Sequence, residues 1–301
     1  MDQTLISATE LQDLQARGAP LMVFDCSFDL TNPALGEQQY HQAHIPGAVY
    51  TSLDDALSDP GVVDADGHRR PHPDAASGGR HPLPSREKFA MWLSAVGMRN
   101  DMQAVVYDRN NSLYCGRLWW MLKWAGHDAV AVLDGGLQAW QAAGGTVSSG
   151  EEPAHFQSNF RLRPALRRLA TTADVERGLA GPGQTVIDAR AAPRYRGEVE
   201  PLDPVAGHIP GALNRPFTQN IGPDGKFKPA AQLRSEFESL LQGRDPAGAV
   251  HQCGSGVSAL PNLIAMEVAG FEPTALYAGS WSEWCSDPER PIERGGPAMN
   301  A

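Results

Sequence analysis

The residue best suited to covalent chemistry in this chain is a cysteine at the start of a glycine-rich turn. Cys253 follows an apolar run at 248–252 and precedes Gly254, Ser255, Gly256, Val257 and Ser258. Glycines let successive backbone N–H groups point inward at an anion, and a helix that follows adds positive potential from its N-terminus. A cysteine at a strand end is more often a packing residue, but the two glycines and two hydroxyls favour a nucleophilic thiolate.

The residues after Cys253 limit what that thiolate could attack. A phosphatase loop of this kind needs an arginine after five intervening residues to hold a phosphate dianion, and that position is Ala259. The loop offers hydroxyls rather than full charges, so a less charged sulfur donor suits it better. No CxxC pair is present, which disfavours a zinc ribbon or a thioredoxin-type site.

The elements that must position Cys253 occur twice along the chain. QAHIPGAV at 42–49 returns as AGHIPGAL at 206–213, and AVLDGGLQAW at 131–140 corresponds to ALYAGSWSEW at 275–284. Corresponding segments late in the two copies are separated by fewer residues than corresponding segments early in the copies. The first copy therefore carries an insertion, which fits the Pro/Gly/His-rich run at 58–85. The repeat places Asp108 where Cys253 stands in the second copy.

Within each copy, short apolar runs alternate with amphipathic segments. Strands are predicted at 21–25, 104–108, 129–134, 185–189, 248–252 and 274–278, and helices at 116–126 and 258–270. Such alternation predicts α/β domains, each a parallel sheet with helices on both faces. The predicted domains are 1–141 and 165–301, joined by a Gly/Ser/Glu/Pro-rich linker at 142–164. Pro261 is tolerated only in a first turn, so the second helix should begin close to Ser258.

Composition excludes several classes of function. With 25 Lys and Arg against 35 Asp and Glu, the net charge of −10 makes nucleic acid an unexpected partner. The sequence contains no run of about 18 apolar residues, which a membrane span would need. No nucleotide or metal motif of any specificity is present, so we expect no cofactor and no metal. The start of the chain lacks the features of a secretory signal, and we expect a cytoplasmic protein.

Two HIPGA-containing α/β units, the CGSGVS loop and the following GSWSEW together resemble the tandem rhodanese-like sulfurtransferases. The loop is most similar to that of the 3-mercaptopyruvate sulfurtransferases, and the resemblance covers almost the whole chain. It implies an enzyme in which Cys253 takes sulfur as a persulfide, releases pyruvate, and passes the sulfur to cyanide or to a thiol such as thioredoxin or a small thiol. It also implies that the first domain, with Asp108, is catalytically inactive.

The resemblance further implies roles for other residues. The family's relay of a loop hydroxyl, a histidine and an aspartate maps to Ser255, His81 and Asp54. Gly254, Gly256, Val257 and Ser258 would bind substrate through the loop, and Arg194 in PRYRG would bind a substrate carboxylate. A second family arginine falls at Leu202, which weakens the expectation for a carboxylate donor.

The departure at Leu202 leaves two donors open, 3-mercaptopyruvate as the main hypothesis and thiosulfate as the alternative. A non-catalytic binding module with the same fold is a third hypothesis, disfavoured by the intact cysteine loop. The remaining chemically interesting residues are expected to be structural or solvated. They are His68 and His72 in the insertion, Cys26, Cys115 and Cys285, and the tryptophans at 119, 120, 124, 140, 281 and 284.

Overall fold

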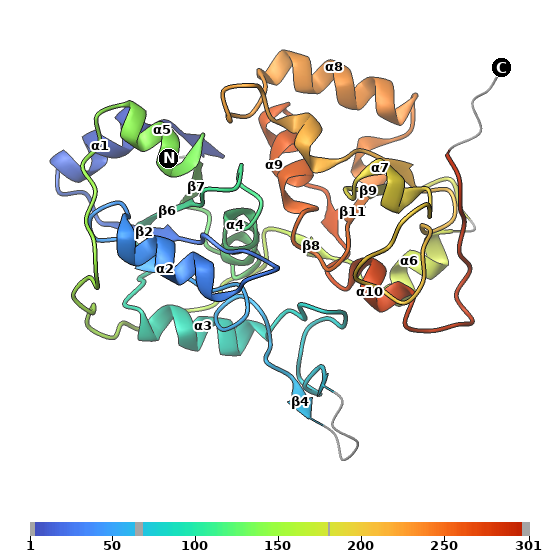
Figure 1. Cartoon of the computed structure of the whole chain (residues 1–301), viewed down its shortest axis with the longest axis horizontal. Coiled ribbons are helices and arrows are strands. Elements are labelled where there is room, and N and C mark those ends of the chain that lie inside the picture. The colour runs from blue at the N-terminus through green and yellow to red at the C-terminus, as the bar shows by residue number, and fades with distance from the viewer. Residues whose placement is uncertain (1–3, 64–68, 180, 297–301) are drawn as a thin grey trace. The chain divides into compact units, whose positions relative to one another are not determined.

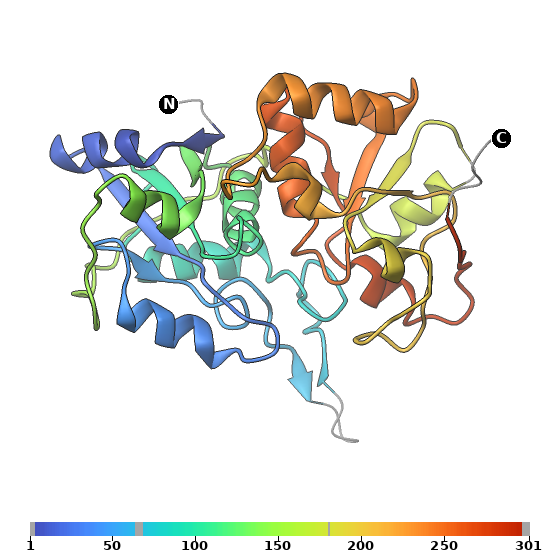
Figure 2. The same ribbon diagram turned by 45° about the horizontal axis from the view of Figure 1, so that its top comes forward.

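The structure, a computed structural model, describes residues 4–63, 69–179 and 181–296 (Figures 1 and 2). His68 lies outside these residues. The chain forms two compact units. The first contains residues up to Pro60, Pro84–Leu166 and Pro223–Phe227, and the second contains Gly61–Leu83, Arg167–Gly222 and Lys228 onward. The Pro/Gly/His-rich insertion therefore leaves the first unit after Pro60 and packs with the second. The domain limits predicted at 1–141 and 165–301 stay predictions.

The first unit is built on a five-stranded parallel sheet. Its strands, in spatial order, are β1 (Leu5–Ile6), β7 (Val130–Leu133), β6 (Gln103–Tyr107), β2 (Leu21–Asp25) and β3 (Val49–Tyr50). Its helices are α1 (Ala8–Ala16), α2 (Ala34–Gln42), α3 (Arg86–Ala95), α4 (Cys115–Trp124) and α5 (Gly136–Ala142). Leu11 and Trp140 pack with Val105 on one face, while Phe24 contacts Trp92 of α3 on the other. Helices thus cover both faces, as predicted.

The second unit repeats this plan. Its parallel strands, in the corresponding spatial order, are β8 (Arg168–Leu169), β12 (Ala275–Leu276), β11 (Ala249–Gln252), β9 (Thr185–Asp188) and β10 (Leu213–Asn214). Its α-helices are α6 (Thr172–Gly178), α7 (Ala192–Tyr195), α8 (Ala230–Leu241), α9 (Leu260–Val268) and α10 (Ser280–Trp284). Val175 and Trp281 pack with Val250 on one face, and His251 contacts Met266 of α9 on the other.

The internal repeat extends to individual hydrogen bonds. After β2 the N–H of Cys26 donates to Tyr107 O at 2.8 Å, and after β9 the N–H of Ala189 donates to Gln252 O at 2.9 Å. Each HIPGA histidine stacks on a tyrosine, with ring centroids 4.0 Å apart for His44 and Tyr40. The equivalent separation is 3.8 Å in the second unit. Each of these buried histidines also bonds through Nδ1 to a backbone carbonyl, of Tyr40 for His44 and of Tyr195 for His208, and so helps to hold its unit together.

Outside the two parallel sheets and their α-helices, the described residues form few regular elements. A short hairpin, β4 (Val62–Val63) with β5 (Arg69–Arg70), lies in the insertion, and two 3-10 turns occupy Phe217–Asn220 and Pro246–Gly248. The predicted linker packs on the first unit, where the N–H of Ser158 donates to Ser94 O at 2.9 Å. Among the described residues, no helix is both long and apolar enough to cross a membrane.

Two predictions about helices are confirmed. Helix α9 begins at Leu260 and places Pro261 in its first turn, where a proline removes no helical hydrogen bond. The tryptophans of α4 are buried, and the rings of Trp120 and Trp124 stack with centroids 5.5 Å apart. Trp140, Trp281 and Trp284 lie in the two cores.

Candidate active site

Cys253 lies at the carboxyl end of β11, a central strand of the second sheet, which is where open parallel sheets hold their ligands. Its backbone is fixed by α10. The N–H of Cys253 donates to Ser280 Oγ at 3.1 Å, and its carbonyl accepts from the N–H of Trp281 at 3.0 Å. The thiol is free, and only 1% of the residue is exposed. The nucleophile predicted from the sequence is therefore held rigidly at a position suited to chemistry.

The loop after Cys253 can turn only because of a glycine. Gly256 has a φ of +72° and packs on the carbonyl of Ala278 so tightly that a Cβ would stand 2.2 Å from that oxygen. Both the positive φ and the close approach make a residue with a Cβ unfavourable at this position. The loop then passes buried Val257 and half-buried Ser258 before α9 begins.

The equivalent loop of the first unit reveals what such a turn binds. Asp108 takes the place of Cys253 at the end of β6, and its carboxylate accepts four backbone hydrogen bonds. Oδ1 accepts from the N–H groups of Asn110 at 2.8 Å and Ser112 at 3.0 Å, and Oδ2 from Tyr114 at 2.8 Å and Cys115 at 3.0 Å. The first loop thus surrounds an anion supplied by its own chain.

The predicted pairing of Ser255 with His81 is present. The distance from Ser255 Oγ to His81 Nδ1 is 2.7 Å, and both residues are buried. His81 belongs to the 61–83 segment of the second unit. Asp54 lies in the first unit, where it lines a cavity of about 570 Å³ with Ser52 and Asp55. Its part in the relay stays a prediction.

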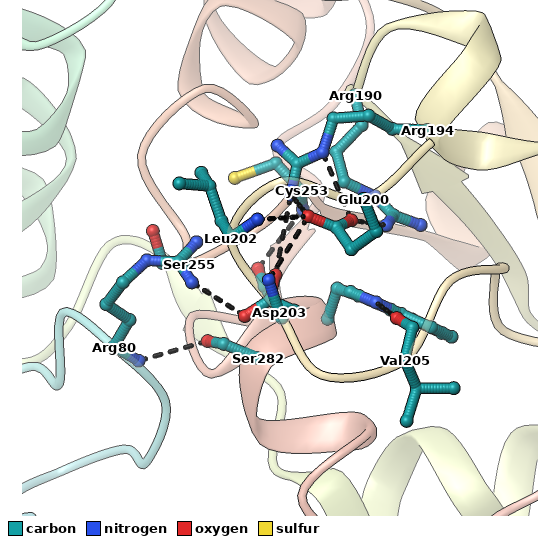
Figure 3. Close-up of polar contacts among 12 residues, drawn as sticks. Arg80, Arg190, Arg194, Glu200, Leu202, Asp203, Val205, Cys253, Ser255 and Ser282 are labelled. Atoms are coloured by element: carbon teal, nitrogen blue, oxygen red, sulfur yellow. Dashed lines mark hydrogen bonds and ion pairs between the residues drawn. The ribbon is translucent and has the colours of Figure 1, made fainter. Parts of the chain in front are cut away.

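Arginine side chains lie close to the loop that follows Cys253 (Figure 3). A Cβ on Gly254 would lie 3.2 Å from Arg80 Nη2 and 3.5 Å from Arg194 Nη2. Arg194, predicted from the sequence, is therefore adjacent to the residue that follows the nucleophile. Its Nη2 donates to Glu200 at 2.6 Å and lies 3.4 Å from Asp203.

Arg190 contributes a third guanidinium, which is buried and paired with Asp188 at 2.7 Å and Glu200 at 3.3 Å. Burial alone would lower the pKa of Arg190, but the charges of Asp188 and Glu200 raise it above its ordinary value. Burial would likewise raise the pKa of Glu200, but the hydrogen bond and charge of Arg194 hold it below its usual range.

Several residues of this region were not predicted from the sequence. Ser282 Oγ accepts from the N–H of Arg80 at 3.0 Å, and Glu283 accepts from the N–H of Gly78 at 3.3 Å, so α10 fixes the segment that carries His81. Arg190 could have been found, because it follows Asp188 just beyond the carboxyl end of a predicted strand. Arg80 precedes His81 directly, but nothing in its local pattern predicts its position at Gly254.

The remaining sequence predictions concern the other cysteines, His72 and Leu202. Cys26, Cys115 and Cys285 are buried and free, and burial raises the pKa of each thiol, to about 11 for Cys285. Such cysteines suit packing roles. His72 pairs with Asp74. Leu202 is 52% exposed, and its backbone N–H donates to Glu200 at 3.1 Å.

Comparison with known proteins agrees with this geometry. The family model "Rhodanese-like domain" matches twice, at residues 7–143 and 171–287. A Pseudomonas aeruginosa protein, named provisionally as a 3-mercaptopyruvate sulfurtransferase, is 46% identical over 91% of this chain and 93% of its own length. The human 3-mercaptopyruvate sulfurtransferase is 34% identical over 89% of this chain and 86% of its own length.

Two further matches extend over nearly the whole chain. SseB of Mycobacterium tuberculosis, named provisionally as a thiosulfate sulfurtransferase, is 41% identical over 97% of this chain and 98% of its own. The crystal structure of SseA, a 3-mercaptopyruvate sulfotransferase from Escherichia coli, superposes with a TM-score of 0.75 at 29% identity, covering 93% of this chain and 99% of its own. The repeated fold, the cysteine loop and these matches make this chain a member of the rhodanese family with two rhodanese-like domains in tandem.

Proposed function

We propose that this protein is a sulfurtransferase that moves sulfur from 3-mercaptopyruvate to a thiol or to cyanide through a persulfide on Cys253. The observation that carries this proposal is the buried cysteine at a strand end beside the 2.7 Å contact between Ser255 and His81. Relatives named for this activity, including the human enzyme, support the choice of donor.

The first half-reaction would begin with attack of the Cys253 thiolate on the thiol sulfur of 3-mercaptopyruvate. A sulfur–sulfur bond forms and the sulfur–carbon bond breaks, so the electron pair leaves on pyruvate as its enolate. Ser255 Oγ, hydrogen-bonded to His81, would donate the proton that converts the enolate into pyruvate. The Arg194 guanidinium would bind the donor carboxylate.

The second half-reaction would regenerate the enzyme. An acceptor thiolate or cyanide attacks the outer sulfur of the persulfide, and the Cys253 thiolate leaves. Backbone N–H groups of Gly254, Gly256, Val257 and Ser258 would stabilise the anionic forms of the cysteine. The loop after Asp108 supports this role, because its backbone N–H groups donate to the Asp108 carboxylate. Thioredoxin, a small thiol or cyanide would each serve as acceptor. The four free thiols suit a reducing compartment, and we assign the protein to the cytoplasm.

Thiosulfate is the second candidate donor. It is favoured by the uncharged Leu202 and by the resemblance of the chain to SseB. Thiosulfate leaves as sulfite, which needs no proton, so this reaction would not require Ser255 and His81. The contact between those two side chains is better explained by a donor whose leaving group must be protonated.

The experiment that tests the proposal compares kcat/KM for the two donors with cyanide as acceptor. The proposal predicts that 3-mercaptopyruvate is the better donor and that Cys253→Ser abolishes turnover while leaving the circular dichroism spectrum unchanged. A higher kcat/KM for thiosulfate would replace the donor. Retained turnover in Cys253→Ser would refute the persulfide mechanism, and absence of turnover with either donor would favour a binding module.

A further inference from the structure

Arg80 is held by two contacts within the second unit beside residues 254–258, which follow Cys253 and are called the nucleophile loop below. Its backbone N–H donates to Ser282 Oγ at 3.0 Å, and its Nη1 forms an ion pair with Asp203 at 2.6 Å. The side chain of Asp203 is 3% exposed, whereas that of Arg80 is 31% exposed. A buried carboxylate therefore fixes a guanidinium that a small molecule can still reach.

In both Arg80 and Arg194, some guanidinium nitrogens pair with carboxylates and others do not. Arg80 donates a hydrogen bond to the Asp203 carboxylate, and Arg194 donates to those of Glu200 and Asp203. Among the described residues, Nη2 of Arg80 and Nη1 of Arg194 donate to no protein acceptor. These two nitrogens lie 3.2 Å and 3.6 Å from the point where a Cβ on Gly254 would stand. Two unused donors from different segments therefore meet at the residue next to Cys253.

We propose that Arg80 binds the carboxylate of the sulfur donor together with Arg194, and so supplies the second cation that Leu202 lacks. This inference rests on the proposed function, because it assigns a specificity role toward the donor. Leu202 is apolar and exposed, and it offers only its backbone N–H, which Glu200 already accepts. A guanidinium binds a carboxylate with charge-assisted hydrogen bonds from a planar fork, and two such groups clamp it from both sides.

The charges of the cluster favour a monoanionic group over a dianion. Three guanidiniums, those of Arg80, Arg190 and Arg194, face the carboxylates of Asp188, Glu200 and Asp203. Formal charge is already balanced before the substrate arrives. A carboxylate adds one negative charge and thiosulfate adds two, so the carboxylate donor costs less electrostatically.

The test measures how much the donor carboxylate contributes in Arg80→Gln, Arg80→Lys and the parent protein. Two donors are compared, 3-mercaptopyruvate and 1-mercaptopropan-2-one, which keeps the ketone and the thiol but replaces the carboxylate by a methyl group. The matched control is Arg196→Gln, because Arg196 lies two residues beyond Arg194 but pairs with exposed Glu198. The proposal predicts that Arg80→Gln raises KM for 3-mercaptopyruvate about 10- to 100-fold with little change in kcat.

The carboxylate-free donor separates binding from a structural effect. Arg80→Gln should leave kcat/KM for 1-mercaptopropan-2-one within about threefold of the parent protein, because no carboxylate contact is lost. Arg80→Lys should reverse part of the rise in KM for 3-mercaptopyruvate, and Arg196→Gln should leave kcat/KM unchanged for both donors. An equal fall in kcat for both donors would mean that Arg80 only positions neighbouring His81, and would overturn the proposal.

A binding measurement distinguishes failure of this inference from failure of the proposed function. Isothermal titration of Cys253→Ser with 3-mercaptopropionate, which has no ketone and cannot release an enolate, reports carboxylate binding without turnover. Adding Arg80→Gln should raise Kd about 10- to 100-fold. That increase would uphold the role of Arg80 even if 3-mercaptopyruvate proved not to be turned over. An unchanged Kd would overturn the inference while leaving the proposed function standing.

Discussion

Gly256 is the residue on which the shape of the nucleophile loop depends most directly, and Gly256→Ala tests that dependence. Its φ of +72° costs an alanine about 1–2 kcal/mol, and the new methyl group would stand 2.2 Å from Ala278 O. Since a carbon atom and a carbonyl oxygen approach to about 3.3 Å, the loop would have to move by about 1 Å.

A displacement of about 1 Å at a reacting group can lower its rate about 100-fold. We therefore expect Gly256→Ala to lower kcat/KM about 100-fold or more. The matched control is Gly211→Ala, because Gly211 has nearly the same φ, +71°, but nothing lies within 4 Å of its Cβ position. The control should lose about 1–2 kcal/mol of stability and keep its activity.

The assay combines steady-state sulfur transfer to cyanide with thermal unfolding of both variants. Both should melt a few degrees below the parent protein, and only Gly256→Ala should lose activity. If Gly256→Ala keeps activity within about threefold of Gly211→Ala, then the tight turn does not set the reactivity of Cys253, and the reasoning is wrong.

Three further predictions concern the relay, a buried histidine and the first unit. Ser255→Ala should lower kcat/KM for 3-mercaptopyruvate about 100-fold but leave kcat/KM for thiosulfate unchanged, because the leaving group of thiosulfate needs no proton. Steady-state kinetics with both donors checks this, and an equal loss for the two donors would contradict it. Burial lowers the pKa of His251 to about 3, so the unfolded state, with a pKa near 6.5, binds more protons between these values. The free energy of unfolding should therefore fall as pH drops below about 6.5, and urea titrations from pH 7 to pH 5 should show a shallower fall in His251→Gln. Asp108→Ala leaves four backbone donors without their acceptor and should cost about 2 kcal/mol or more in urea unfolding, while sulfur loading of Cys253 persists.

Much of the fold could be predicted because its signals are local. The apolar run before Cys253 and the glycines after it define a strand and a turn within a few residues, and the observed β11 and α9 follow them. Strands of two residues, such as β3 and β10, have no periodicity to read, and their pairing depends on neighbouring strands.

The site was less predictable because its parts come from distant segments. The contact of His81 with Ser255 could be expected only from the family resemblance, since no local pattern links two residues so far apart along the chain. The position of Arg80 depends on how the insertion packs against α10 and on an ion pair with Asp203. The spacing of residues in the sequence predicts neither contact.

The central claim is that Cys253 carries sulfur, and intact-mass measurement tests it most directly. The reduced protein is incubated separately with 3-mercaptopyruvate and with thiosulfate, and the same is done with Cys253→Ser. The account predicts that the parent protein gains the mass of about one sulfur atom, most readily from 3-mercaptopyruvate, and that Cys253→Ser gains none. A protein whose reduced Cys253 gains no sulfur from either donor, or a Cys253→Ser variant that gains it equally, would contradict the account.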